Sequence, residues 1–123
     1  MKTLILLVVG AAVLDYVTGV LAATKGGKVS SADGVKGLYK KLSLFCALAL
    51  GFFLDAAIPV LAEAGFSKEL SAGLPFGLIV AAWVVLNELV SVLENLARCG
   101  VRLPKVVAGM LRAAREKMDG DGG

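Results

Sequence analysis

Three long apolar runs are the feature that most constrains how this chain of 123 residues folds. They extend over residues 3–23, 42–62 and 70–93, so each contains at least 21 residues. A helix of 21 residues is about 31 Å long, which is enough to cross the hydrocarbon core of a bilayer. The runs lack the apolar–polar alternation of a membrane β-strand. The sequence therefore predicts an all-α integral membrane protein with three transmembrane helices.

Composition leads to the same expectation. The chain is 58% hydrophobic and only 19% charged, and its mean hydropathy is +0.82. A soluble domain has about half its residues apolar and roughly a quarter charged. A water-soluble monomer of this composition would expose large apolar patches. We expect residues 1–123 to form a single membrane domain.

The basic residues divide unevenly among the segments outside the apolar runs. Lys68 is the only basic residue between the second and third runs. The predicted loop 24–41 carries five: Lys25, Lys28, Lys36, Lys40 and Lys41. The C-terminal segment carries six: Arg98, Arg102, Lys105, Arg112, Arg115 and Lys117. Because short loops rich in lysine and arginine stay cytoplasmic, the N-terminus is predicted outside and the C-terminus inside.

The first apolar run has an alternative interpretation as a cleaved signal peptide. Lys2, an apolar stretch and small residues near Ala22 fit the general form of such a peptide. Asp15, however, interrupts what should be an uninterrupted apolar region. Cleavage would also leave the lysine-rich loop outside, against the charge rule. We favour a retained transmembrane helix.

Each apolar run contains one carboxylate: Asp15, Asp55 and Glu88. A charged residue at the middle of a transmembrane helix costs about 2.5–3.5 kcal/mol, so such residues normally face protein or water. We expect Asp15 to lie in a helix–helix contact or beside a water-filled lesion. Asp55 and Glu88 have an alternative, because each can lie near the interface and reach lipid headgroups.

The first run also has small residues at every fourth position, which form one helical face with Asp15. Small residues at this spacing let two helix backbones approach closely, which is the usual basis of helix association in lipid. The sequence therefore predicts an oligomer-packing face made of Ala11, Asp15, Gly19 and Ala23. The alternative is the general abundance of alanine and glycine in this chain.

The third run becomes polar toward its end. Its polar residues recur at steps of three and four, so they form a stripe on a helix. Such side chains bond across helices or line water. The predicted stripe contains Asn87, Glu88, Ser91, Glu94 and Asn95.

Two prolines mark predicted hinges. Pro59 removes the helical hydrogen bond to the carbonyl of residue 55 and is expected to kink the second span. Pro104 separates the third span from a segment at 104–118 that has one apolar and one basic face. That segment is predicted to be an amphipathic helix lying on the anionic inner leaflet. A helix that packs on neighbouring subunits would give the same pattern.

Nothing in the chain predicts an enzyme or a cofactor site. The sequence has no histidine, and Cys46 and Cys99 match no metal or redox spacing. It also lacks a Gly-rich phosphate loop and a nucleophile next to a base. The positive charge is explained by topology and by attraction to the leaflet, so no nucleic-acid partner is expected.

Two motifs resemble a known family. They are Asp-Tyr-Val-Thr-Gly at residues 15–19 and Asn-Glu-Leu-Val-Ser-Val-Leu-Glu-Asn at residues 87–95. With Lys40-Lys41, Leu54-Asp55, Gly100 and Pro104, they resemble phage holin family 4, the toxin-secretion and phage-lysis holins. The resemblance covers about residues 14–111.

This resemblance implies a homo-oligomer that accumulates in the cytoplasmic membrane of a bacterial host and then opens lesions. An endolysin, or a toxin without a signal peptide, would leave through them with no need to contact the holin directly.

Two other classes of function remain open at this stage. A small proton-coupled exporter also carries a carboxylate in its first span, but such dimeric transporters have four spans and this chain is predicted to have three. A membrane anchor or assembly subunit would use the basic C-terminal segment for docking. Co-purification of a stoichiometric foreign subunit would favour that reading.

The small-residue face gives a first prediction. Gly19→Leu should delay or abolish lysis, because a bulky side chain at this position keeps helix backbones apart. Membrane insertion should be unaffected, as judged by the amount of protein in the membrane fraction. Normal lysis timing in this variant would contradict the packing role of Gly19.

Overall fold

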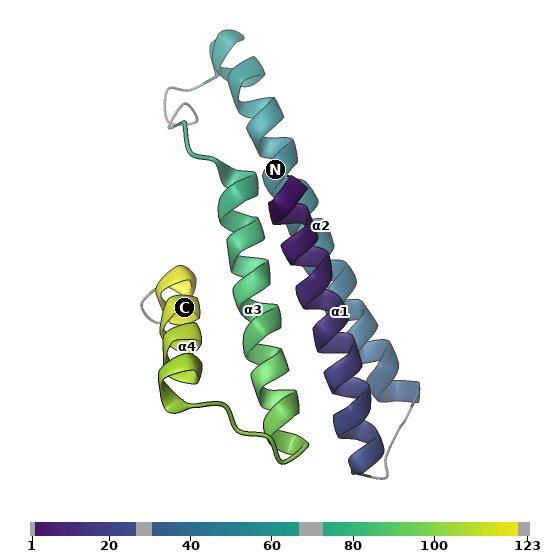
Figure 1. The fold of residues 1–123 in the computed structure, drawn as a ribbon. Coiled ribbons are helices and arrows are strands. Elements are labelled where there is room, and N and C mark those ends of the chain that lie inside the picture. Colours follow the sequence, from purple (N-terminus) through teal and green to yellow (C-terminus); the bar gives the residue numbers. More distant parts are fainter. Residues whose placement is uncertain (1, 27–30, 67–72, 121–123) are drawn as a thin grey trace.

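The computed structural model describes residues 2–26, 31–66 and 73–120. They form four helices: α1 at Lys2–Lys25, α2 at Ser31–Glu63, α3 at Phe76–Arg98 and α4 at Lys105–Asp119 (Figure 1). Within these residues there is no strand, and α1, α2 and α3 are long and apolar enough to cross a membrane. The predicted fold class, three membrane-spanning helices and a fourth helix, is confirmed.

Helix α3 is the central element of the bundle. It packs against α1, α2 and α4. Figure 1 shows α1 and α3 running in the same direction, with α2 and α4 running opposite to them. The C-terminal ends of α1 and α3 therefore lie at the same end of the bundle as the N-terminal ends of α2 and α4.

A small apolar core joins α1 to α3. Val8, Ala81 and Val84 are buried there, with half-buried apolar side chains of α2 and α3 around them. Most large apolar side chains point outward instead. Leu6 of α1 and Phe53 of α2 are each 70% exposed. Such a surface suits lipid, where the backbone must be satisfied within each helix but the outer side chains need not be polar.

The first connection is much shorter than predicted. Helix α2 begins at Ser31 and includes Lys36, Lys40 and Lys41, which the sequence placed in a loop at 24–41. The physical reason is that leucine and lysine favour the helix, and that Lys41 finds its partners inside the bundle. The expectations for Lys28 and Lys68 lie outside the described residues.

The third span begins later than predicted. Its helix starts at Phe76 rather than at residue 70, and residues 70–72 lie outside the described part of the chain. Gly73 has φ +63°, which ordinary residues rarely adopt, and Pro75 occupies the N-cap position. These two residues interrupt the helix within the apolar run. Hydropathy alone does not detect such an interruption.

The two predicted hinge prolines lie in different settings. Helix α2 continues through Pro59 to Glu63. Pro104 is the N-cap of α4, just after the chain has reversed direction at Gly100, where φ is +91°. Motion at either proline stays a prediction.

Close contact between α2 and α3 depends on glycine. A Cβ atom added at Gly77 would overlap with the ring of Phe52 and lie 2.8 Å from Oδ2 of Asp55. A Cβ added at Gly51 would lie 3.0 Å from the carbonyl oxygen of Phe76. The two helices therefore meet almost backbone to backbone at this level, as glycines permit in membrane proteins.

Gly77→Ala should accordingly destabilise the bundle. Overpacking of this kind costs about 1–3 kcal/mol, and we expect a lower melting temperature in detergent by circular dichroism. Gly10→Ala is the matched control, because a Cβ at Gly10 of α1 meets nothing within 4 Å. Equal melting temperatures for the two variants would contradict the close contact.

Candidate functional site

A lysine holds two carboxylates inside the bundle. Nζ of Lys41 in α2 lies 2.7 Å from Oδ2 of Asp15 in α1 and 2.7 Å from Oε2 of Glu88 in α3. The side chains of Lys41, Asp15 and Glu88 are 20%, 14% and 4% exposed. Three charged groups from three helices thus form one polar cluster at the centre of the molecule.

Asn95 extends this cluster toward the C-terminal end of α3. Its Nδ2 donates hydrogen bonds to Oδ1 of Asp15 at 2.9 Å and to Oγ1 of Thr18 at 3.0 Å. The Asn95 oxygen accepts a hydrogen bond from Arg98. Asn95 and Thr18 are both buried. We call Asp15, Thr18, Lys41, Glu88 and Asn95 the polar network.

The polar network is internally satisfied. No buried side-chain nitrogen or oxygen among the described residues lacks a hydrogen-bond partner. Desolvated charges are tolerated only when they are paired and hydrogen-bonded, as Asp15, Lys41 and Glu88 are. In this arrangement the helices hide their polar groups from lipid. The same groups would form a wettable surface if the helices separated.

The structure divides the predicted polar stripe of α3. Glu88 and Asn95 belong to the polar network, and half-buried Ser91 lies beside Asp15. Asn87 instead donates to the carbonyl oxygen of Trp83 on its own helix, and Glu94 is exposed. Neighbouring residues of a helix are 100° apart, so sequence spacing alone does not show which polar side chains of α3 face α1. A role of the whole stripe in an oligomer stays a prediction.

Asp55 binds the backbone at the start of α3. Its carboxylate accepts hydrogen bonds from the backbone N–H groups of Phe76 at 2.7 Å and Gly77 at 2.9 Å. These are orphan donors at the start of α3, where the helix dipole also favours a negative charge. Asp55 of α2 therefore caps α3 in this structure and is separate from the polar network.

The small-residue face of α1 is occupied within the chain. Ala11 is buried, and Ala23 is half-buried. A Cβ atom added at Gly19 would lie 3.6 Å from Nδ2 of Asn95 in α3. Asp15 likewise binds partners on α2 and α3. The sequence predicts that these four residues pack between subunits, and this stays a prediction. Within one subunit Asp15 and Gly19 already contact other helices, because the face turns toward the central helix α3.

Lys41 and Thr18 are the members that sequence reasoning missed. The sequence predicts a loop position for Lys41, because this residue lies beside Lys40 and just before the apolar run at 42–62. A helical spacing of apolar residues indicates that the second helix begins before residue 42. These residues, at steps of three and four, are Val35, Leu38 and Leu42. Thr18 belongs to the Asp-Tyr-Val-Thr-Gly motif, but nothing in the sequence shows that it contacts Asn95.

The comparison with known families fits this three-span bundle. The model described as "Bacteriophage holin family" matches residues 1–116. The chain belongs to the bacteriophage holin family. The family resemblance predicted from the two motifs is therefore confirmed, and the molecule is a holin-like membrane protein.

Three similar proteins carry names that describe them as uncharacterized proteins. BH0965 of Halalkalibacterium halodurans is 37% identical over 93 residues, which cover 76% of this chain and 64% of that protein. Lmo0128 of Listeria monocytogenes is 29% identical over 99 residues, covering 80% and 62%. YqxH of Bacillus subtilis is 29% identical over 107 residues, covering 87% and 68%. The chain thus spans less than two thirds of the first two relatives. No solved structure matches it.

The ion pairs of Lys41 give the third prediction. Lys41→Met leaves Asp15 and Glu88 buried without their cation, and breaking a buried pair in this way costs about 3–5 kcal/mol. We expect a large drop in the detergent melting temperature and a lower yield of folded protein. Lys40→Met is the matched control, since Lys40 is the adjacent residue and is exposed.

Replacing the carboxylates as well should recover stability. Asp15→Leu and Glu88→Leu, added to Lys41→Met, remove the uncompensated charges and leave apolar side chains of similar size. A triple variant no more stable than Lys41→Met would show that lost packing, rather than unpaired charge, causes the defect.

Proposed function

We propose that this chain is a working holin. It accumulates in the cytoplasmic membrane of a bacterium, assembles into oligomers, and opens lesions that let an endolysin or a signal-less toxin leave the cell. The observation that carries the proposal is the polar network shared by α1, α2 and α3 in a member of the holin family. A protein that only anchored a partner would have no evident use for paired charges inside three spans.

The polar network supports two states of the helices. In the closed state its charges are paired inside the bundle, and apolar side chains such as Leu6 and Phe53 face lipid. In the open state α1 or α2 moves away from α3, and water replaces the lost partners of Asp15, Lys41 and Glu88. Separation of the pairs in lipid is unfavourable, because unpaired charges would remain there. Opening therefore requires enough subunits to enclose water.

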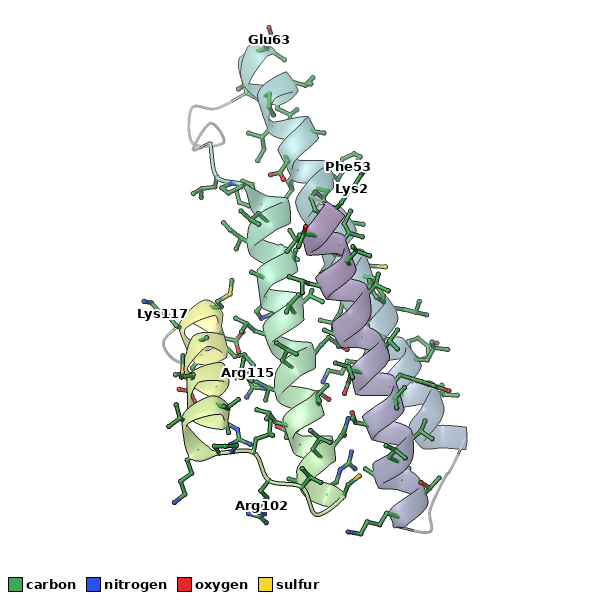
Figure 2. The ribbon with its side chains drawn as sticks, in the orientation of Figure 1. Lys2, Phe53, Glu63, Arg102, Arg115 and Lys117 are labelled. Carbon is green, nitrogen blue, oxygen red and sulfur yellow. The ribbon has the colours of Figure 1, made fainter. Side chains whose placement is uncertain are left out.

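The arrangement of the helices supports the proposed topology. Lys25 at the end of α1 and Arg98 at the end of α3 lie at the same end of the bundle (Figure 1). Arg102, in the connection to α4, lies at this end too (Figure 2). Basic ends of spans stay cytoplasmic, so the N-terminus lies outside and the C-terminus inside in this proposal.

Induced expression in bacteria tests the function. Membrane potential and growth are followed with and without a co-expressed endolysin that lacks a signal peptide. We expect abrupt depolarisation after a lag, and lysis only when the endolysin is present, because the enzyme reaches the cell wall only through a large hole. Insertion with the potential and viability intact would contradict a holin and favour an exporter or an anchor.

A matched pair of triple variants tests the role of the polar network. Asp15→Leu, Lys41→Met and Glu88→Leu together should permit insertion and abolish depolarisation, since the lesion loses its wettable lining. Lys40→Met, Glu63→Leu and Glu116→Leu remove the same number of lysines and carboxylates from exposed positions and should leave lysis timing near normal. Equal lysis by both variants would contradict the role of the polar network.

A further inference from the structure

Helix α4 lies alongside the second half of α3 and runs opposite to it (Figure 1). Near its end, Oδ1 of Asp119 accepts a hydrogen bond of 2.6 Å from Nε1 of Trp83. Val90, two helical turns along the same face of α3, is 0% exposed. The half-buried residues of α4 share one face, and they are Ala108, Leu111, Ala114, Arg115 and Met118. This face packs on the Trp83 side of α3.

The docked position conflicts with a lipid-embedded α3. Fifteen residues separate Trp83 from Arg98 at the cytoplasmic end of the span, which corresponds to about 22 Å. The Asp119 carboxylate therefore lies deep at the level of the hydrocarbon core, which is about 30 Å thick. Helix α4 carries six charged residues in 15, namely Lys105, Arg112, Arg115, Glu116, Lys117 and Asp119. Such a helix is unstable at that depth against lipid.

The face of α3 beneath α4 suits lipid well. Trp83, Leu86, Val90 and Ala97 on this face are apolar, and exposed Glu94 lies at its edge near the cytoplasmic end of α3. In water the hydrophobic effect favours packing of this face against α4. In lipid that driving force is absent. Helix α4 has another place available, because exposed Val106 and Met110 and its excess of basic residues match an anionic membrane surface.

We propose that α4 is a detachable arm. In a subunit embedded in a sealed membrane it leaves α3, pivots at residues 101–104, and lies on the anionic inner leaflet. Its docked position, held by Trp83 and Asp119, belongs to a subunit whose Trp83 side of α3 faces water. This second part rests on the proposed function, since water reaches that side only in a lesion.

Distances between nitroxide labels test the proposal. The full chain carries Cys46→Ser and Cys99→Ser, with labels on Ile79→Cys in α3 and Lys117→Cys in α4. Lys117 points away from α3, so its label does not block docking (Figure 2). The labelled chain is diluted with unlabelled chain in vesicles of phosphatidylethanolamine and phosphatidylglycerol. The docked helix places the two positions on the order of 15 Å apart, and the surface position separates them by more than about 30 Å.

We expect the longer distance in vesicles that retain a trapped dextran, and a return of the shorter one when the dextran escapes. The control pair Leu6→Cys and Leu78→Cys, both exposed on α1 and α3, should keep one distance in detergent and in sealed vesicles. Trp83 is the only tryptophan, so its fluorescence gives a check without a label. Brominated acyl chains should quench this fluorescence strongly in sealed vesicles, where α4 no longer covers Trp83.

A docked distance in sealed vesicles overturns the proposal. A long distance that persists after dextran release overturns its second part. If dextran never escapes at any protein density, the proposed function fails, whereas the sealed-vesicle distance still decides whether α4 detaches.

Discussion

The two ion pairs of Lys41 are the interaction on which the bundle depends. Helix α3 packs against both α1 and α2, and the Lys41 side chain of α2 reaches both of the other spans, so it holds all three together. Glu88 is almost fully buried and Asp15 nearly so, and neither is tolerable in lipid without a cation. The pairs add little net stability over an apolar core, but they are costly to break one at a time. Their contribution is therefore to specificity, because they hold the three helices in one register. The helices can separate from that register only if water replaces the lost partners of the charged groups.

Much of the fold was predictable because a membrane span is a local property. Length and hydropathy of about 20 residues decide it, so the three spans followed from the sequence without knowledge of contacts. The ends of the spans were less predictable. Helix α2 begins early, at Ser31, and so includes Lys41, which has its partners inside the bundle. Helix α3 begins late, at Phe76, because Gly73 and Pro75 interrupt the apolar run. A mean hydropathy over about 20 residues detects neither effect.

The site was predictable only in part, because it joins residues far apart in the sequence. Asp15 and Glu88 stood out as carboxylates in apolar runs, and Asn95 by its helical spacing from Glu88. Their cation did not stand out, since Lys41 is one of five lysines between the first two runs and only the folded bundle distinguishes it from Lys40. Asp55 is also a carboxylate in an apolar run, but its partners are the backbone N–H groups at the start of α3. A position in an apolar run does not show which group a carboxylate will bind.

The central position of α3 gives the detachment of α4 a consequence for assembly. In the structure three neighbours surround α3, and its Trp83 side is the one covered by an element that lipid does not favour there. If α4 moves to the membrane surface as proposed, Val90 is uncovered while the polar network on the opposite side of α3 stays paired. In that proposal a second copy would pack on the uncovered apolar side without breaking an ion pair, so early association would leave the membrane sealed. The proposed opening would follow only when the polar network itself meets water. Association and opening would then be separate steps, because they would use opposite sides of one helix.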